Sequence, residues 1–218
     1  MMPFADRRDA GRQLASRLAP WRKAAPLVLG LPRGGVPVAF EVATALHAPL
    51  DVLIVRKLGC PGQPELGLGA IGEDGVLVRN RDLIAQSGVS PAQLERIVAA
   101  EQAELARRLE RYRGGRPGRS LQARTVLLID DGLATGFTAR AAIEVARHRG
   151  AAQVVLAVPV APAETVAELA SVADHVVCVQ QPRWFTAIGG FYDDFRQTSD
   201  EEVAELLAAA DTTAAPRG

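Results

Sequence analysis

Residues 125–139 have the sequence TVLLIDDGLATGFTA, the most informative stretch of this chain. It begins as a run of β-branched residues and leucines, the pattern of a strand that is buried on both faces of a parallel sheet. Asp130 and Asp131 end the run, and the carboxyl ends of strands in open α/β sheets carry the ligand-binding groups. Small and hydroxyl residues follow and open a helix predicted over residues 139–149, so free backbone N–H groups point outward. A ligand with both hydroxyl and phosphate groups, such as a sugar phosphate, fits this combination.

A second stretch, PRGGVPVA at residues 32–39, follows a strand predicted at residues 27–31. The glycines Gly34 and Gly35 let the backbone approach a ligand closely, and a helix predicted over residues 36–46 presents its N-terminus there. Arg33 adds a forked cation suited to phosphate oxygens. A Gly-Gly turn alone is a weak signal, and its meaning depends on the stretch at residues 125–139.

The two stretches together resemble the type I phosphoribosyltransferases. Residues 125–139 are similar to that family's signature for phosphoribosyl diphosphate (PRPP), in which two acids follow a hydrophobic strand and precede a small-Thr-Gly-x-Thr loop. The resemblance implies that Asp130 and Asp131 hold the ribose 2′- and 3′-hydroxyls. It also implies that the 5′-phosphate is held by the loop Ala134, Thr135, Gly136, Phe137 and Thr138. The alternative is an ordinary Rossmann-like turn with a solvated acidic pair.

The same resemblance assigns Arg33, Gly34 and Gly35 to the loop that binds pyrophosphate. That loop often contains a non-proline cis peptide, which is expected here just before Arg33. Gly132 departs from the family pattern, which usually has an aliphatic residue at this position.

A strand predicted at residues 50–55 ends at Arg56 and Lys57, whose cations would face the same ligand edge. A solvated basic pair is the alternative. Residues 58–75 are rich in glycine, and a segment of this kind does not pack rigidly. The family has a flexible loop at the corresponding place, so residues 58–80 are predicted to be a lid over the reacting centre.

A capping box at Ser90 and Gln93 starts a long helix that ends at Gly114. Its far end is basic, with Arg107, Arg108, Arg111, Arg113, Arg116 and Arg119. A nucleic-acid surface is one interpretation, but no aromatic residues accompany the arginines. Arginines that favour a helix C-terminus, interleaved with glutamates, are the preferred interpretation, and no nucleic-acid partner is expected.

Strands that alternate with helices predict a doubly wound, mainly parallel five-stranded α/β sheet. Because both phosphate loops must reach one ligand, the strands are expected in the order 2-1-3-4-5. Residues 180–197 hold five of the ten aromatic residues, and the resemblance implies a hood in which Trp184 or Phe185 stacks on the acceptor base. Aromatic anchoring of the last helix, residues 200–210, is the alternative. We therefore expect one domain over residues 1–210 and a loose tail at residues 211–218.

Composition sets wider limits. Lys plus Arg equals Asp plus Glu in the 218 residues, so no net charge attracts nucleic acid or an anionic membrane. Cys60 and Cys178 form no metal or redox motif, consistent with a reducing compartment. No signal peptide and no membrane-spanning run is evident. A cytoplasmic protein without a membrane partner is expected, with a homodimer left open.

The resemblance implies magnesium-dependent transfer of a phosphoribosyl group from PRPP to a small nitrogenous base, with release of pyrophosphate. Arg33, Lys57 and Arg56 would bind the leaving group, and Mg²⁺ would be held mainly through PRPP oxygens. Ala134 stands where the 6-oxopurine branches have an aspartate, which weakens that assignment of the acceptor. A PRPP-sensing regulator without catalysis and a PRPP or nucleotide hydrolase remain as alternatives.

Overall fold

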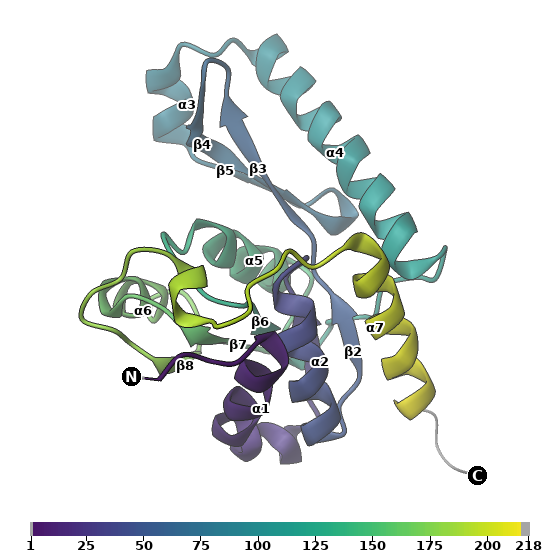
Figure 1. The fold of residues 1–218 in the computed structure, drawn as a ribbon. Coiled ribbons are helices and arrows are strands. Elements are labelled where there is room, and N and C mark those ends of the chain that lie inside the picture. Colours follow the sequence, from purple (N-terminus) through teal and green to yellow (C-terminus); the bar gives the residue numbers. More distant parts are fainter. Residues whose placement is uncertain (1, 215–218) are drawn as a thin grey trace.

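The computed structural model describes residues 2–214, apart from the side chains of residues 64–66 and 213–214. It contains a five-stranded sheet and a separate three-stranded sheet. Figure 1 shows the larger sheet in the lower part of the molecule, where helices cover both of its faces, and the smaller sheet above it beside a long helix. Within the described residues, no helix is both long and apolar enough to cross a bilayer.

The larger sheet confirms the predicted architecture. Its strands are β1 (Leu27–Gly30), β2 (Leu50–Val52), β6 (Thr125–Ile129), β7 (Gln153–Val160) and β8 (His175–Gln180). All neighbours are parallel, in the order β2-β1-β6-β7-β8. If only the five strands of this sheet are numbered in chain order, β6, β7 and β8 become the third, fourth and fifth strands, and the order is the predicted 2-1-3-4-5. The register places Gly30 beside Ile129, so the loops that follow β1 and β6 leave the sheet side by side.

Successive residues of the central strands alternate between two hydrophobic layers, as the period of a strand requires. Val28, Leu127 and Val155 pack toward α1 (Arg7–Leu18), α2 (Gly35–Leu46) and α7 (Asp200–Ala214). Leu29, Leu128 and Leu156 pack toward α5 (Phe137–His148) and α6 (Ala163–Leu169). The central strands are therefore buried on both faces, which explains why β1, β6 and β7 are largely continuous apolar runs.

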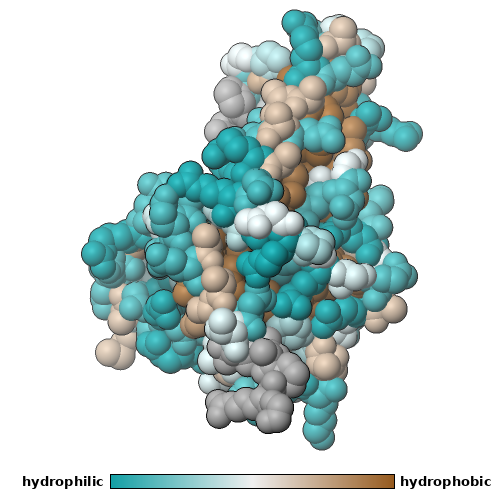
Figure 2. All heavy atoms as spheres, turned by 90° about the vertical axis from the view of Figure 1, so that its right-hand side faces the viewer, coloured by the Kyte–Doolittle hydropathy of each residue, from teal (hydrophilic) through white to brown (hydrophobic). Residues whose placement is uncertain are grey.

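Residues 58–80 correct the sequence analysis, which predicted a flexible loop there. They belong to an antiparallel sheet of β3 (Val55–Cys60), β4 (Gln63–Gly72) and β5 (Leu77–Arg79), with a short 3-10 turn, η2 (Glu73–Gly75). Leu58, Leu68 and Ile71 are buried against α3 (Arg81–Ser87) and α4 (Pro91–Arg113). The glycines suggested flexibility, but the apolar residues between them form a small core. We call residues 55–113 the lobe; Figure 2 shows hydrophobic surface running through this upper part of the molecule.

A buried ion-pair network joins the lobe to the larger sheet. Arg113, the last residue of α4, lies 2.9 Å from Asp51 of β2 and 2.8 Å from Glu73 of η2. Its Nη2 also donates to the Val52 carbonyl oxygen at 2.9 Å. Arg149, just after α5, contacts Glu73 at 3.2 Å. Because all these side chains are buried or nearly so, the network fixes the place where the lobe leaves the sheet.

The N-terminal segment meets the segment between β8 and α7 on one side of the larger sheet. The Phe4 N–H donates to the Phe191 carbonyl oxygen at 2.8 Å, and the Asp193 N–H donates to the Phe4 carbonyl oxygen at 2.9 Å. Phe4 is fully buried against Tyr192. The segment between β8 and α7 therefore packs as part of the fold, with a 3-10 turn, η3, at Ile188–Phe191. Helix α7 continues to Ala214, beyond the predicted end at residue 210, and residues 215–218 of the predicted tail lie outside the described part.

Candidate functional site

The loop after β1 and the acidic pair Asp130 and Asp131 are in direct contact. A Cβ atom placed on Gly34 would lie 2.6 Å from Cγ of Asp131, and one on Gly35 would lie 2.8 Å from Cα of Asp130. Only residues without a side chain allow this approach. The peptide bond between Pro32 and Arg33 is cis, at the position implied by the family resemblance. The structure therefore brings together the two stretches that were singled out in the sequence.

The acidic pair lies in a poorly solvated position. Burial raises the pKa of Asp130 well above its ordinary value, and the neighbouring carboxylate of Asp131 raises it further. Burial also raises the pKa of Asp131, although the charge of Arg7 opposes this shift. Oδ1 of Asp130 accepts the backbone N–H of Asp131 at 2.9 Å. Asp131 is buried and Asp130 is partly buried, and two such acids side by side favour a ligand that brings hydrogen-bond donors or positive charge.

Arg7 is a member of this site that the sequence analysis did not identify. Its Nε donates to Oδ2 of Asp131 at 2.8 Å, and both side chains are 11% exposed. A cation in the first turn of a helix is disfavoured by the helix dipole. That unfavourable local placement is the sequence signal that could have indicated a distant acidic partner.

The loop of residues 134–138 presents unpaired backbone amides. No described residue accepts a hydrogen bond from the N–H groups of residues 134–139, and the first helical bond is from the Arg140 N–H to the Gly136 carbonyl oxygen. Gly136 adopts the left-handed conformation, with φ of 68°. Ala134, Thr135 and Thr138 are exposed. The loop is therefore open to solvent and can receive an anion.

Arg56 and Lys57 lie on opposite faces of β3, because successive side chains of a strand alternate. Lys57 Nζ lies 5.5 Å from the centre of the Phe137 ring, at the loop of residues 134–138. The guanidinium of Arg56 instead contacts Glu101 of α4 at 2.7 Å. The structure therefore brings Lys57 to the candidate site and leaves Arg56 on the α4 side of the lobe.

Arg33 and Gly35 have partners that the sequence did not suggest. Arg33 Nη1 lies 3.8 Å from Asp200, the first residue of α7. The hydroxyl of Tyr112 donates to the same carboxylate at 2.7 Å. The Gly35 N–H donates to the Leu31 carbonyl oxygen at 3.0 Å, so this amide is used inside the protein. The N–H of Gly34 has no such partner among the described residues.

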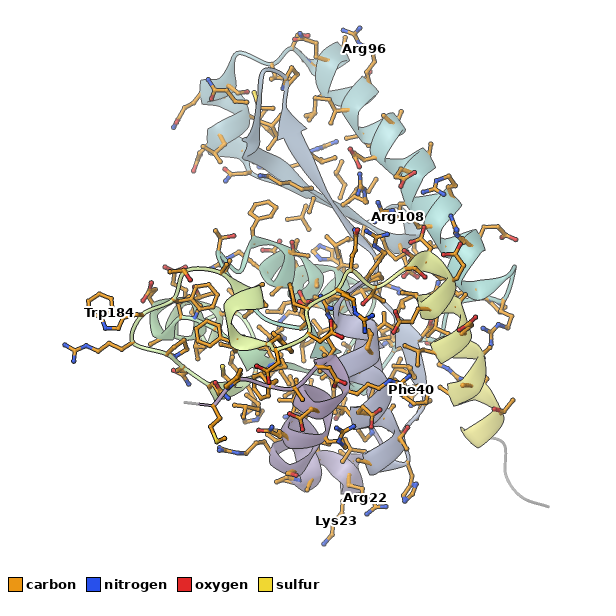
Figure 3. All side chains as sticks on the ribbon, viewed as in Figure 1. Arg22, Lys23, Phe40, Arg96, Arg108 and Trp184 are labelled. Carbon is orange, nitrogen blue, oxygen red and sulfur yellow. The ribbon has the colours of Figure 1, made fainter. Side chains whose placement is uncertain are left out.

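Trp184 is not brought to the site. It is 82% exposed and points away from the molecule at the outer edge of the segment 180–197 (Figure 3). Phe185 stacks on Phe191 with ring centres 5.5 Å apart. Tyr192 is the aromatic residue of this segment that reaches the acidic pair, since its hydroxyl donates to the Asp131 carbonyl oxygen at 2.5 Å. Burial raises the pKa of Tyr192, so this hydroxyl remains a donor.

The basic end of α4 has carboxylate partners throughout, which favours the structural interpretation. Arg107 and Arg108 pair with Glu104, and Arg111 pairs with Asp200 and Glu201. Arg113 belongs to the buried network, and both Arg116 and Arg119 pair with Asp211. In Figure 3, Arg108 lies near the junction of the lobe and α7. These internal pairs leave little positive charge for a phosphate backbone.

Comparison with known proteins gives one family. Residues 9–196 match the model of the phosphoribosyl transferase domain. Two Mycobacterium tuberculosis proteins, one of them named "Putative phosphoribosyl transferase Rv0571c", are 55% identical to this chain over 210 residues. The alignment covers 96% of this chain and 47% of each relative, so the chain spans about half of their length. The crystal structure of TT1426 from Thermus thermophilus is 47% identical, covers 95% of this chain and 99% of that one, and superposes with a TM-score of 0.86.

Proposed function

This chain belongs to the phosphoribosyl transferase domain family, and on that premise we propose that it transfers a phosphoribosyl group from PRPP to a nitrogenous base. The observation that carries the proposal is the meeting of three groups at the ends of β1 and β6. The turn at Gly34 touches Asp131, the acidic pair lies poorly solvated beside it, and the amides of residues 134–138 are unpaired among the described residues. This arrangement supplies separate places for the pyrophosphate, the ribose and the 5′-phosphate of one ligand.

The loop of residues 134–138 anchors the 5′-phosphate in this proposal. Its open amides and the N-terminus of α5 attract an anion. Lys57 lies over the Phe137 ring of the same loop and adds a full positive charge. Anchoring one end of PRPP in this way fixes the ribose relative to the acidic pair, which lowers the entropy lost when the reacting atoms align.

The acidic pair accepts hydrogen bonds from the ribose hydroxyls. As the bond from C1 to pyrophosphate breaks, the ribose gains oxocarbenium character, and the negative charges of Asp130 and Asp131 stabilise it. The leaving pyrophosphate gains negative charge at the same time. Arg33 and the unpaired N–H of Gly34 bind that charge more strongly in the transition state than in the ground state. A nitrogen of the acceptor base then forms the new bond to C1, and its proton is released to solvent as pyrophosphate leaves.

Magnesium fits this donor set as an ion held mainly through PRPP oxygens. Among the described residues, no group of three or more His, Cys, Asp or Glu side chains can hold a metal ion. Mg²⁺ binds through few protein ligands where phosphates are present. When bound, it supplies positive charge that offsets the charge of the leaving pyrophosphate.

The acceptor is a small nitrogenous base, and Ala134 argues against a 6-oxopurine. Its side chain offers no carboxylate to a purine ring nitrogen, and its carbonyl oxygen accepts a hydrogen bond from the Thr165 hydroxyl at 2.9 Å. The alignment covers 47% of each Mycobacterium tuberculosis relative, so these relatives are about twice as long as this chain. Recognition of the base by the whole protein is therefore part of this proposal.

A pyrophosphate-release assay with PRPP, MgCl₂ and a panel of purine and pyrimidine bases tests the proposal. Release that depends on one base supports transfer. Release without any base identifies PRPP hydrolysis, and calorimetric binding of PRPP without release identifies a sensor. If PRPP does not bind at all, the assignment of this site is wrong.

A further inference from the structure

The contact between Arg7 and Asp131 is held in place on several sides. Arg7 Nη1 donates to the Arg196 carbonyl oxygen at 2.7 Å, while Nε donates to Asp131. Its guanidinium carbon lies 3.9 Å from the centre of the Phe195 ring, within the range of a cation–π contact. The contacts with Arg196 and Phe195 therefore orient the guanidinium toward one oxygen of Asp131.

The entry of the chain into α1 explains why Arg7 reaches this place. Phe4 pairs with the segment around Tyr192, and the Asp194 N–H donates to the Ala5 carbonyl oxygen at 3.0 Å. Asp6 caps α1 by accepting the Asp9 N–H at 2.7 Å. Arg7 follows directly as the first helical residue. The N-terminal segment and the segment after β8 thus position this side chain together.

The charged and titratable groups that face Asp131 are few. Arg7 faces Asp131 from α1, and Tyr192 faces it from the segment after β8. Asp130 is the residue before Asp131, directly after β6. The turn before α2 presents Gly34, which carries no charge. Asp194 and Arg196 pair with each other at 2.7 Å at the exposed edge of the site. Among the described residues, Arg7 is therefore the cation that directly contacts the acidic pair.

We propose that Arg7 is a positioning residue for the ribose-binding carboxylate of Asp131. Its guanidinium fixes one carboxylate oxygen and keeps the carboxylate ionised next to Asp130. The carboxylate is then ready to accept ribose hydroxyls before PRPP arrives, which is a form of preorganisation. This inference rests on the proposed binding of PRPP, because PRPP binding gives the contact between Arg7 and Asp131 a role beyond packing.

The test compares Arg7→Met, Arg7→Lys and Arg8→Met with the unmodified chain. PRPP affinity is measured by calorimetry with MgCl₂ from pH 5 to 8. Arg7→Met should weaken binding by about tenfold or more, as expected for the loss of a charge-assisted hydrogen bond. Its binding curve should also move to higher pH, because without the cation the carboxylate ionises less readily. Arg7→Lys should restore part of both effects.

Arg8→Met is the matched control. Arg8 is the next residue of α1 and pairs with Glu41 at 3.1 Å, so its loss changes the net charge equally without touching Asp131. If Arg7→Met lowers the melting temperature but leaves both PRPP affinity and its pH dependence unchanged, Arg7 has a purely structural role and the proposal is overturned.

A second measurement separates this inference from the proposed function. The carboxyl pKa of Asp131, followed by ¹³C NMR without PRPP, should rise in Arg7→Met and stay unchanged in Arg8→Met. An unchanged pKa in Arg7→Met overturns the positioning role even if PRPP binds. Failure of the unmodified chain to bind PRPP, with the pKa of Asp131 raised in Arg7→Met, overturns the proposed function alone.

Discussion

The hydroxyl of Tyr192 donates a hydrogen bond of 2.5 Å to the backbone carbonyl oxygen of Asp131. Tyr192 is only 7% exposed, and its ring lies 5.4 Å from that of Phe4. Through this bond, the segment after β8 reaches the turn that follows β6. Tyr192 thus links the segment after β8 to the backbone of the acidic pair. Trp184, which belongs to the same segment, is exposed and lies away from the pair.

Tyr192→Phe is predicted to destabilise the protein and to weaken PRPP binding. The change removes the hydroxyl and leaves the Asp131 carbonyl oxygen without this donor. Loss of such a buried partner costs about 1–3 kcal/mol. Urea unfolding would measure the change in stability, and calorimetry would measure PRPP affinity. A variant as stable as the unmodified chain would show that the hydrogen bond contributes nothing.

Gly34→Ala is predicted to displace the carboxylate of Asp131. Gly34 has an ordinary helical φ of −59°, so the effect comes from the added methyl group and not from backbone strain. Overpacking of this kind costs about 1–3 kcal/mol, and PRPP affinity should fall by about tenfold or more. Gly190→Ala is the control, because its nearest neighbour would be the Thr186 hydroxyl at 3.9 Å. Equal effects of the two changes on PRPP affinity would contradict the contact.

Lys57→Met and Arg56→Met are predicted to differ, although the residues are adjacent. Lys57 faces Phe137 and the loop of residues 134–138, so its loss should reduce kcat/KM by about ten- to a hundredfold. Arg56 pairs with Glu101, so its loss should lower stability slightly and leave kcat/KM almost unchanged. Steady-state kinetics on both variants would check this, and a larger kinetic loss in Arg56→Met would reverse the assignment of the two faces.

Asp130 is predicted to make the unliganded protein less stable as the pH rises. Its pKa in the folded chain is raised above the ordinary value of 3.8, so the folded state binds the extra proton between these two values. The free energy of unfolding must therefore fall as the pH rises through that window. Asp130→Asn should flatten this dependence. Denaturant unfolding from pH 4 to 8 would measure it, and equal slopes for both proteins would exclude Asp130 as the cause.

Arg113→Met is predicted to loosen the junction between the lobe and the larger sheet. The change leaves Asp51 and Glu73 buried without their main cation, which costs about 3–5 kcal/mol. Arg107→Met, which removes an exposed pair with Glu104, is the control and should have little effect. Hydrogen exchange should rise in β3 and β4 of Arg113→Met. Unchanged exchange there, with stability intact, would show that the network does not hold the lobe.

The larger sheet could be predicted well from the sequence because its signals are local and mutually consistent. The central strands are apolar runs, and the acids and small residues at residues 130–138 follow such a run directly. The capping box at Ser90 and Gln93 is present as predicted. The pairing of β1 with β6 followed from the requirement that both loops reach one ligand. The strands and the capping box depend on residues near one another in the chain, and the pairing of β1 with β6 follows from the ligand that their loops share.

Features that depend on distant residues could not be predicted in the same way. The sequence places Asp131 at the carboxyl end of a strand, but nothing near it indicates Arg7 and Tyr192, which contact it from segments 124 and 61 residues away. Gly132 departs from the family pattern because Ile188 packs over it: a Cβ atom there would lie 2.6 Å from the Ile188 side chain. Nothing near Gly132 in the sequence indicates that neighbour.

The ion-pair network at Arg113 has a consequence for exchanging parts between relatives. The lobe is one continuous insertion between β2 and β6, so residues 55–113 are a natural unit for a chimera. Glu73 and Arg113 would travel with the insert, whereas Asp51 and Arg149 would stay with the recipient. Such a chimera is therefore expected to fold only when both proteins carry the same charges at these four positions. A mismatch would leave an unpaired charge buried away from water.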